Sequence, residues 1–268
     1  MDTRSIRELL NDFEKYTPVL GHHSGNLKQH SLWVSYYIQE ALMFPELSPI
    51  GCATTALQKH TLHSGKPVNY EKILIVSSLL HDIGKGGDHV YTYSSKPDHE
   101  ITGYKYLEGE LVYTYENGNI LNTRKLFKSL GLTSIQVDIV NFLVLHHWDL
   151  GKLIIELDYI DALKYSSTQD IDKLSKEIAK RFCSIISRKT QITKAIVLMQ
   201  FILCCADVMG AQPYCGESQE LELFPLSKYP EFTKDCFKTS FSVYRKYYYG
   251  KIIKNVFPEI CKILGIKK

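Results

Sequence analysis

The sequence predicts an all-α fold: one domain, residues 1–268, built as a single helical bundle with one small β-hairpin insertion. The first observation behind this prediction is that apolar residues recur at the spacing of an α-helix through most of the chain. The second is that 268 residues, 44% of them hydrophobic and 12% aromatic, suffice to bury a large core. The third is that no internal repeat, low-complexity linker or clear boundary divides the chain.

The first half of the chain is expected to be helical at five places. Asn26 can cap one helix at its N-terminus, and Pro45 stops that helix because proline cannot continue the hydrogen-bond pattern. Gly84 ends another helix, and Asp98 suits a helix start. The expected segments are Arg4–Tyr16, Asn26–Phe44, a short helix between Pro49 and Lys66, Tyr70–Asp82, and a helix that begins near Asp98.

Asn117 and Gly118 lie between β-prone residues, a pattern typical of the turn of a β-hairpin. A connection between two helices is the alternative interpretation of the same stretch. Farther along, apolar stripes predict more helices, and Ser134 is a candidate N-cap for one of them. The expected segments are Ser134–Trp148, Thr168–Ile186, Ile192–Gly210 and one or two helices within Pro230–Leu264.

Charge, cysteine content and hydropathy favour a soluble, cytoplasmic protein. A net charge of +3 and a pI of about 8.3 do not by themselves demand a nucleic-acid partner. The 7 cysteines include no C-x-x-C pair, and Cys204 and Cys205 stand in an apolar run, as reduced core thiols do. No apolar run reaches the roughly 18 residues that a membrane span needs, and the charged N-terminal segment lacks the apolar core of a signal peptide. We therefore expect no membrane partner.

The stretch SSLLHDIGKGGDH, Ser77–His89, carries the first sign of chemistry. An apolar run ends there in His81 and Asp82, and the glycine-flanked Lys85 follows. Other side chains that can bind a metal occur at helix ends or on apolar faces: His30, His99, His146, His147 and Asp207. A lone buried carboxylate is costly, and coordination of a metal is one of the few arrangements that stabilises it. Imidazole and carboxylate together suit divalent Mn, Fe, Zn or Mg.

Each of these residues also has a structural explanation when it is taken alone. A single helical histidine such as His30 is more often a satisfied core residue. A histidine at a helix C-terminus, such as His146, interacts favourably with the helix dipole. Asp207 could pair with a buried Arg, Lys or Tyr, and Lys85 could be an exposed loop charge. The full set, with each member at a helix end or on an apolar face, indicates a shared metal site.

The order of these residues resembles that of the HD superfamily of metal-dependent phosphohydrolases, in its two-metal form. LLHDIGKG matches the second motif of that family closely, and DHEITGYKYL resembles its His-x-x-x-Gly helix. LVLHHW is similar to the His-His element of two-metal members, and CCADVMG to the terminal Ala-Asp motif. The resemblance covers about Leu27 to Gly210. It implies an HD-type bundle at about 27–210, with helical extensions on either side.

Carried over position by position, the resemblance implies two divalent metal ions, with Mn, Fe, Mg, Zn and Ni as candidates. The residues that would hold the first ion are His30, His81, Asp82 and Asp207. Asp82 would also bridge to a second ion. The residues that would hold this second ion are His99 and His146, with His147 close by.

The resemblance further implies a phosphomonoesterase or phosphodiesterase that uses metal-activated water on a nucleotide, cyclic nucleotide or short oligonucleotide. Besides the bridging Asp82, Lys85 would contact the substrate phosphate, and His147, Glu100 or Asp149 would protonate the leaving oxygen. The Gly-Tyr-Pro signature of cyclic di-nucleotide phosphodiesterases is absent after the His-His pair, which argues against cyclic di-GMP as the substrate. The alternatives are a di-iron oxygenase of the same superfamily and a non-catalytic regulatory domain that binds a nucleotide or a partner.

The expected partner is a small phosphorylated substrate such as a nucleotide. Basic and aromatic residues alternate in SVYRKYYYGKIIK, Ser242–Lys254, and this segment could hold short single-stranded nucleic acid by stacking and phosphate contacts. The simpler explanation is an amphipathic helix with packed tyrosines and solvated lysines. The sequence does not determine the oligomeric state.

Overall fold

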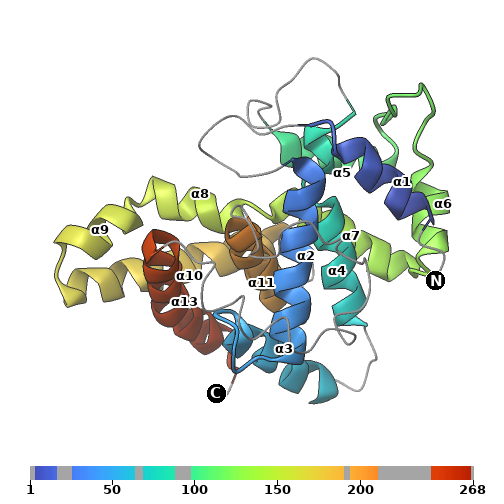
Figure 1. Ribbon diagram of the computed structural model, residues 1–268. Coiled ribbons are helices and arrows are strands. Elements are labelled where there is room, and N and C mark those ends of the chain that lie inside the picture. Colours follow the sequence, from blue (N-terminus) through green and yellow to red (C-terminus); the bar gives the residue numbers. More distant parts are fainter. Residues whose placement is uncertain are drawn as a thin grey trace.

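A computed structural model describes residues 4–16, 26–63, 69–87, 98–189, 194–210 and 243–266. Within these residues all regular secondary structure is helical, which confirms the all-α prediction. The elements labelled in Figure 1, with the 3-10 helix η1, are α1 (Arg4–Phe13), α2 (Leu27–Met43), α3 (Gly51–His63), α4 (Tyr70–Leu80), η1 (Ile83–Lys85), α5 (His99–Glu108), α6 (Thr123–Ser129), α7 (Ser134–His146), α8 (Asp149–Glu156), α9 (Tyr159–Tyr165), α10 (Thr168–Lys189), α11 (Lys194–Gly210) and α13 (Val243–Leu264).

Helices α2, α4, α7 and α11 form the centre of the molecule (Figure 1). α2 packs against both α4 and α11, and α4 packs against α7. α4 and α11 are buried around nearly their whole circumference, as expected of helices that are apolar on all sides. Cys204 and Cys205 in α11 are buried free thiols, as the sequence predicted. α5 lies against η1 and α7, which places its first residue near the end of α4.

The other helices flank this centre. α1 and α6 lie on one side, and α8, α9, α10 and α13 lie on the other (Figure 1). α10 packs along α13. Residues 230–242 and the side chains of residues 243–249 lie outside the described residues, so the nucleic-acid contact suggested for Ser242–Lys254 stays a prediction.

Most helix ends follow the expected capping chemistry. Asn26 caps α2 through a capping box with Gln29, in which each side chain bonds to the other residue's backbone N–H. Thr133, rather than Ser134, caps α7, because the side chain one position earlier forms the capping box with Gln136. The short helices α6, α8 and α9 were not expected, since few residues carry too little periodic signal to be recognised.

The segment around Asn117 and Gly118 is a minimal hairpin. An isolated antiparallel bridge joins Thr114 to Ile120, and Tyr115 N–H donates to Asn119 O at 2.8 Å. Gly118 has a positive φ of 80°, which glycine adopts without strain. The hairpin prediction is therefore confirmed for the turn, but the flanking residues do not extend into strands.

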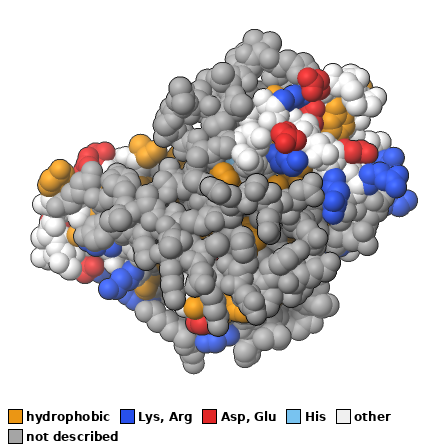
Figure 2. All heavy atoms as spheres, in the orientation of Figure 1, with side chains coloured by type: hydrophobic (Ala, Val, Ile, Leu, Met, Phe, Trp, Pro, Cys, Tyr) orange, Lys and Arg blue, Asp and Glu red, His pale blue; other side chains and the backbone are white. Residues whose placement is uncertain are grey.

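No single helix among the described residues is long and apolar enough to cross a membrane; one bent pair, Thr123–Ser129 with Ser134–Glu156, passes that test only when its two parts are combined. Figure 2 shows acidic and basic side chains intermixed over the described part of one face. This mixture agrees with the small net charge of +3.

Candidate metal centre

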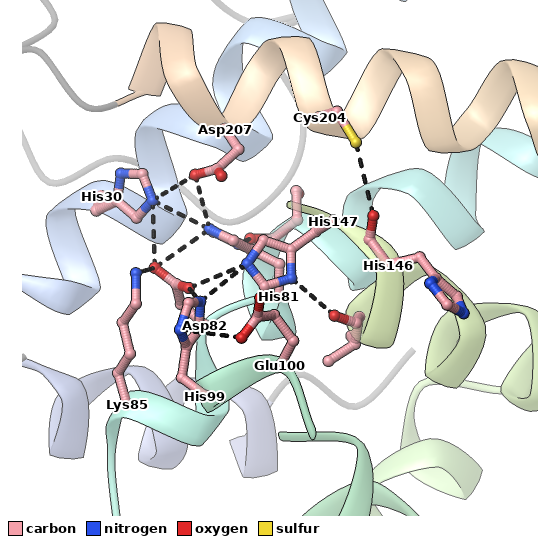
Figure 3. Close-up of polar contacts among 12 residues, drawn as sticks. His30, His81, Asp82, Lys85, His99, Glu100, His146, His147, Cys204 and Asp207 are labelled. Atoms are coloured by element: carbon pink, nitrogen blue, oxygen red, sulfur yellow. Dashed lines mark hydrogen bonds and ion pairs between the residues drawn. The ribbon is translucent and has the colours of Figure 1, made fainter. Parts of the chain in front are cut away.

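The first group of candidate ligands joins three helices that are far apart in the sequence. α2 contributes His30, the end of α4 is followed by His81 and Asp82, and α11 contributes Asp207 (Figure 3). His30 Nε2 lies 3.0 Å from His81 Nε2 and 3.0 Å from Asp207 Oδ1. His81 Nε2 lies 3.3 Å from the same oxygen of Asp207. The structure thus brings these four residues together.

α2 and α11 cross closely, so that residues from both helices can meet in the first group. A Cβ atom at Gly210 would lie 2.4 Å from Val34 Cγ2, so glycine permits an approach that a larger residue would block. His30 Nδ1 lies 3.0 Å from the carbonyl oxygen of the same Gly210. The end of α11 therefore both approaches α2 and orients its histidine.

The second group of candidate ligands consists of Asp82, His99 and His147. Asp82 Oδ1 lies 3.2 Å from His99 Nε2 and 3.4 Å from His147 Nε2, and these two nitrogens are 3.2 Å apart. The other oxygen, Asp82 Oδ2, faces the first group, at 3.4 Å from His30 Nε2 and 3.5 Å from His81 Nε2. Asp82 therefore stands between the groups and presents one carboxylate oxygen to each (Figure 3).

Gly84 allows α5 to reach Asp82. A Cβ atom at Gly84 would lie 1.9 Å from the backbone oxygen of His99 and 2.5 Å from the backbone nitrogen of Gly103. Because both of these atoms belong to the backbone of α5, no side-chain rotation could relieve the overlap. The missing side chain of Gly84 is thus a condition for placing His99 beside Asp82.

The imidazoles of both groups are held by their Nδ1 atoms. His30 Nδ1 faces the carbonyl oxygen of Gly210, as described above. In the same way, His81 Nδ1 lies 2.7 Å from Ser78 O, and His147 Nδ1 lies 2.7 Å from Val144 O. A carbonyl oxygen can only accept, so in each pair Nδ1 carries a proton and donates it, which leaves Nε2 facing the cluster. His99 Nδ1 lies 3.3 Å from Glu100 Oε2. Such partners are the usual means by which proteins orient metal-binding histidines.

The cluster has the electrostatics of a cation site. Burial would raise the pKa of Asp82, but Lys85 and His81 outweigh it and hold the pKa well below its ordinary value. Burial of Asp207 is likewise outweighed, by His30 and His81, and its pKa is also well below the ordinary value. Burial lowers the pKa of His99 and so favours its neutral form. Two ionised carboxylates are therefore enclosed together with the imidazoles.

The pKa of His81 is shifted in the opposite direction from the pKa of His99. Burial lowers the pKa of His81, but the Asp82 and Asp207 carboxylates raise it by more, so that the net pKa lies above its ordinary value. In the absence of another cation, His81 thus supplies positive charge between two buried carboxylates. A metal ion would take over this charge, and binding would release the proton.

The residues present fit two divalent ions that share Asp82. Donor atoms bound to one ion at about 2.1 Å lie roughly 3 Å from one another. Each Nε2 atom of the two groups lies 3.0 to 3.5 Å from another Nε2 atom or from a carboxylate oxygen of its own group. The sets whose ligand atoms all lie within 4.8 Å of one another are His30, His81 and Asp82, and Asp82, His99 and His147. Asp82 Oδ1 is buried and has no hydrogen-bond partner among the described residues, and coordination to a metal ion would give it one. The mixture of imidazole and carboxylate suits Mn, Fe, Mg, Zn and Ni.

The structure does not place His146 in the cluster. His146 Nδ1 lies 2.7 Å from Asp149 Oδ2, its ring stacks on Phe142, and it points away from Asp82 (Figure 3). Successive residues of a helix are rotated by about 100°, so only one of two adjacent histidines can face a given point. His147 is that residue. The expectation that His146 is the ligand and His147 its neighbour is therefore corrected.

Lys85 lies beside the cluster. Its Nζ atom lies 2.7 Å from Asp82 Oδ2. We expected this lysine to contact a substrate phosphate. Its side chain is 11% exposed, compared with 10% for Asp207 and 16% for His99, whereas the side chains of His30, His81 and Asp82 are fully buried. His99, Lys85 and Asp207 are therefore the side chains of this group that are not fully buried.

A further cation near the second group was not expected from the sequence. Lys152 in α8 places Nζ 2.8 Å from Glu100 Oε1, while the other oxygen of Glu100 faces His99. Burial would raise the pKa of Glu100, but His99 and Lys152 outweigh it and leave the pKa below its ordinary value. Lys152 lies in a helix that was itself unexpected, and no motif marks it, so the sequence offered no signal for this contact.

Comparisons of the chain with protein-family models, with curated proteins and with solved structures found no match. The geometry of the two ligand groups is therefore the basis for inferring the function of the protein.

Proposed function

We propose that the protein is a metal-dependent phosphohydrolase in which Asp82 bridges two divalent ions. The observation that carries this proposal is the position of Asp82, with one buried oxygen toward each of two groups of imidazole Nε2 atoms. A site for one structural ion needs a single closed set of about four ligands. Two ligand groups that share a carboxylate, with three nearby side chains that are not fully buried, suit a reaction centre better.

The two ligand groups would hold divalent ions, which would lower the pKa of bound water and neutralise charge that develops on a phosphoryl oxygen. The residues of the chain supply position and charge. Asp82 holds the two groups together, and the backbone carbonyls that accept from Nδ1 fix the imidazoles of His30, His81 and His147. The Lys85 ammonium lies close enough to the carboxylate to contact a phosphate that enters beside it.

The expected proton donors do not fit that role. His147 uses Nδ1 to donate to Val144 O, and its Nε2 faces Asp82, so we assign His147 to coordination. Glu100 is held ionised by His99 and Lys152, and it orients His99. Asp149 is engaged by His146. The proton for the leaving group must therefore come from another source, such as water.

The substrate that fits best is a small phosphate ester such as a nucleotide. A site with a few buried cations and carboxylates recognises a phosphoryl group, whereas a long nucleic acid requires an extended basic surface. The net charge of +3 is small, and Figure 2 shows acidic and basic side chains intermixed over the described part of one face.

Oxygenase chemistry is the second candidate function, because four imidazoles and two carboxylates are also a suitable ligand set for iron. The same cluster would then hold two iron ions and react with O2. Metal content after anaerobic purification, together with O2 consumption, separates this candidate from the first.

The test is a screen of the purified protein against nucleotides, cyclic dinucleotides and simple phosphoesters with Mn, Mg, Co or Fe, alongside elemental analysis. We expect release of phosphate or nucleotide and a loss of at least about 100-fold in Asp82→Asn, which removes charge but preserves shape. Glu46→Gln, an exposed carboxylate substitution, is the matched control and should retain full activity. Full activity in Asp82→Asn would refute the mechanism. Binding of nucleotide without turnover would favour a regulatory domain.

A further inference from the structure

Lys85 is followed by a glycine pair that rests on three tyrosines. A Cβ atom at Gly86 would lie 2.7 Å from the Tyr113 hydroxyl, and one at Gly87 would lie 2.8 Å from Tyr113 Cδ2 and 3.1 Å from the Tyr106 hydroxyl. Gly87 has a positive φ of 76°. The chain that leaves the metal cluster therefore passes directly over aromatic rings and uses a conformation that glycine adopts without strain.

A hydrogen bond fixes this loop to a different part of the molecule. Gly87 N–H donates to the Tyr16 hydroxyl at 2.8 Å. Tyr16 is buried, and its own carbonyl accepts from Leu27 N at 2.9 Å, at the start of α2. Through Tyr16, Gly87 is thus connected to the N-terminus of α2, the helix that carries His30.

The Tyr16 hydroxyl also belongs to a larger polar chain. It interacts with the hydroxyl of Tyr113, which in turn donates to Asp12 Oδ2 at 2.7 Å. Asp12 accepts at its other oxygen from Lys15 Nζ at 2.8 Å and from Glu116 N–H at 3.0 Å. Because every member is held by at least one further partner, the acceptor presented to Gly87 has a fixed position.

The position of Lys85 depends on this anchor. Its backbone N–H bonds to Asp82 O at 2.9 Å, and Gly86 N–H bonds to Ile83 O at 3.1 Å, so the turn is short and ends at the glycine pair. Glycines alone would leave the direction of the turn poorly determined. The hydrogen bond from Gly87 to Tyr16 fixes the end of the turn that is farther from Asp82 along the chain.

We propose that Tyr16 is a positioning residue: through Gly87 it keeps the Lys85 ammonium against Asp82 Oδ2 and thereby weakens the binding of a divalent ion by the first ligand group. The inference rests on the proposed metal centre. Lys85 places a positive charge 2.7 Å from an oxygen that the ion would use, so the two cations compete. A substrate phosphate that draws Lys85 away would strengthen metal binding, and by linkage the metal would strengthen binding of the phosphate.

A double-mutant cycle on Mn²⁺ affinity tests this inference without any assay of activity. The affinity is measured from the electron paramagnetic resonance signal of free Mn²⁺ in wild type, Tyr16→Phe, Lys85→Gln and the double variant. We expect Lys85→Gln to tighten binding by roughly tenfold, because it removes a neighbouring positive charge. Tyr16→Phe should tighten binding by roughly threefold, and in the Lys85→Gln background it should add nothing.

Tyr115→Phe is the matched control. The Tyr115 ring lies 5.6 Å from that of Tyr113, but Tyr115 is not bonded to the glycine pair, so this variant should bind Mn²⁺ as wild type does. Should Tyr16→Phe fail to fold, Tyr113→Phe removes the next hydroxyl of the chain and should act in the same direction.

An unchanged affinity in Tyr16→Phe, or the same factor in both backgrounds, would overturn the positioning role while leaving the metal centre intact. Absence of Mn²⁺ binding in all variants would overturn the proposed metal centre and this inference with it. Non-additivity confined to the Tyr16 and Lys85 pair is the result that supports the proposal.

Discussion

The Nε2 atoms of His30 and His81 lie 3.0 Å apart, although each ring also has a backbone carbonyl at its Nδ1. Two neutral rings in this arrangement point lone pairs at each other, and only a proton or a metal ion between them can make the contact favourable. The same geometry recurs between His99 and His147, whose Nε2 atoms are 3.2 Å apart. The fold therefore holds together imidazole groups whose close contact depends on a proton or a metal ion.

Removal of metal should consequently lower thermal stability. A ligand at 100 times its Kd stabilises the folded state by about 2.7 kcal/mol per site, or about 5.4 kcal/mol for two sites, which for a chain of this size raises Tm by roughly 10 to 20 °C. We expect Mn²⁺ to raise Tm by this amount and EDTA to reverse the change, as measured by differential scanning calorimetry. In Asp82→Asn the Mn²⁺-dependent shift should vanish. Equal Tm values for wild type in Mn²⁺ and in EDTA would contradict the proposed site.

Substitutions of the two adjacent histidines should have different consequences. His147→Gln removes a ligand of the second group, so elemental analysis should find about one ion per chain where wild type holds two. His146→Gln should keep both ions, because His146 bonds to Asp149 and points away from Asp82. This variant should only lower the free energy of unfolding, by about 1 kcal/mol, because one hydrogen bond is lost. A reversed pattern would show that His146 is the ligand after all.

Gly84→Ala should separate the second group from the first. The added Cβ would overlap the backbone of α5, so His99 must move away from Asp82. We expect metal content to fall toward one ion per chain while binding by His30, His81 and Asp207 persists. Gly103→Ala is the control, because its Cβ would meet its nearest neighbours at 3.2 to 3.3 Å and requires only small shifts. Equal metal content in the two variants would count against the role given to Gly84.

Glu40 should make stability fall as pH rises. This carboxyl group in α2 is buried, neither oxygen has a hydrogen-bond partner in the part of the chain that the structure describes, and burial raises its pKa from 4.5 to about 8. Between these two values the unfolded chain is ionised while the folded protein keeps the proton, so each pH unit lowers the free energy of unfolding by about 1.4 kcal/mol. The loss is complete above the folded pKa, and the full stability is present below the unfolded one.

Glu40→Gln removes this titration. The variant should match wild type near pH 4.5 and exceed its free energy of unfolding by roughly 3 kcal/mol at pH 7. Urea denaturation across this pH range, in EDTA so that metal binding does not contribute, gives the comparison. Glu46→Gln alters an exposed carboxylate and should reproduce the wild-type slope. A wild-type slope in Glu40→Gln would place the pH dependence elsewhere.

Much of the fold and most of the candidate site follow from the sequence. The long helices carry clear apolar periodicity, and His81-Asp82 ends an apolar run, so both were recognisable. The choice between His146 and His147 was not, because α7 is largely apolar and a shift of one residue rotates the side chain by about 100°. The roles of Gly84 and Tyr16 depend on contacts between distant segments, which no local pattern encodes.

The contact between His30 and Gly210 spans 180 residues of sequence. During synthesis, the N-terminal half of the cluster must therefore wait until α11 has emerged before Asp207 can join it. Closing so large a loop is slow compared with forming local helices. Capture of an ion by the complete first group would consequently be a late event in folding, and an ion held there would report that both ends of this chain segment have reached their final positions.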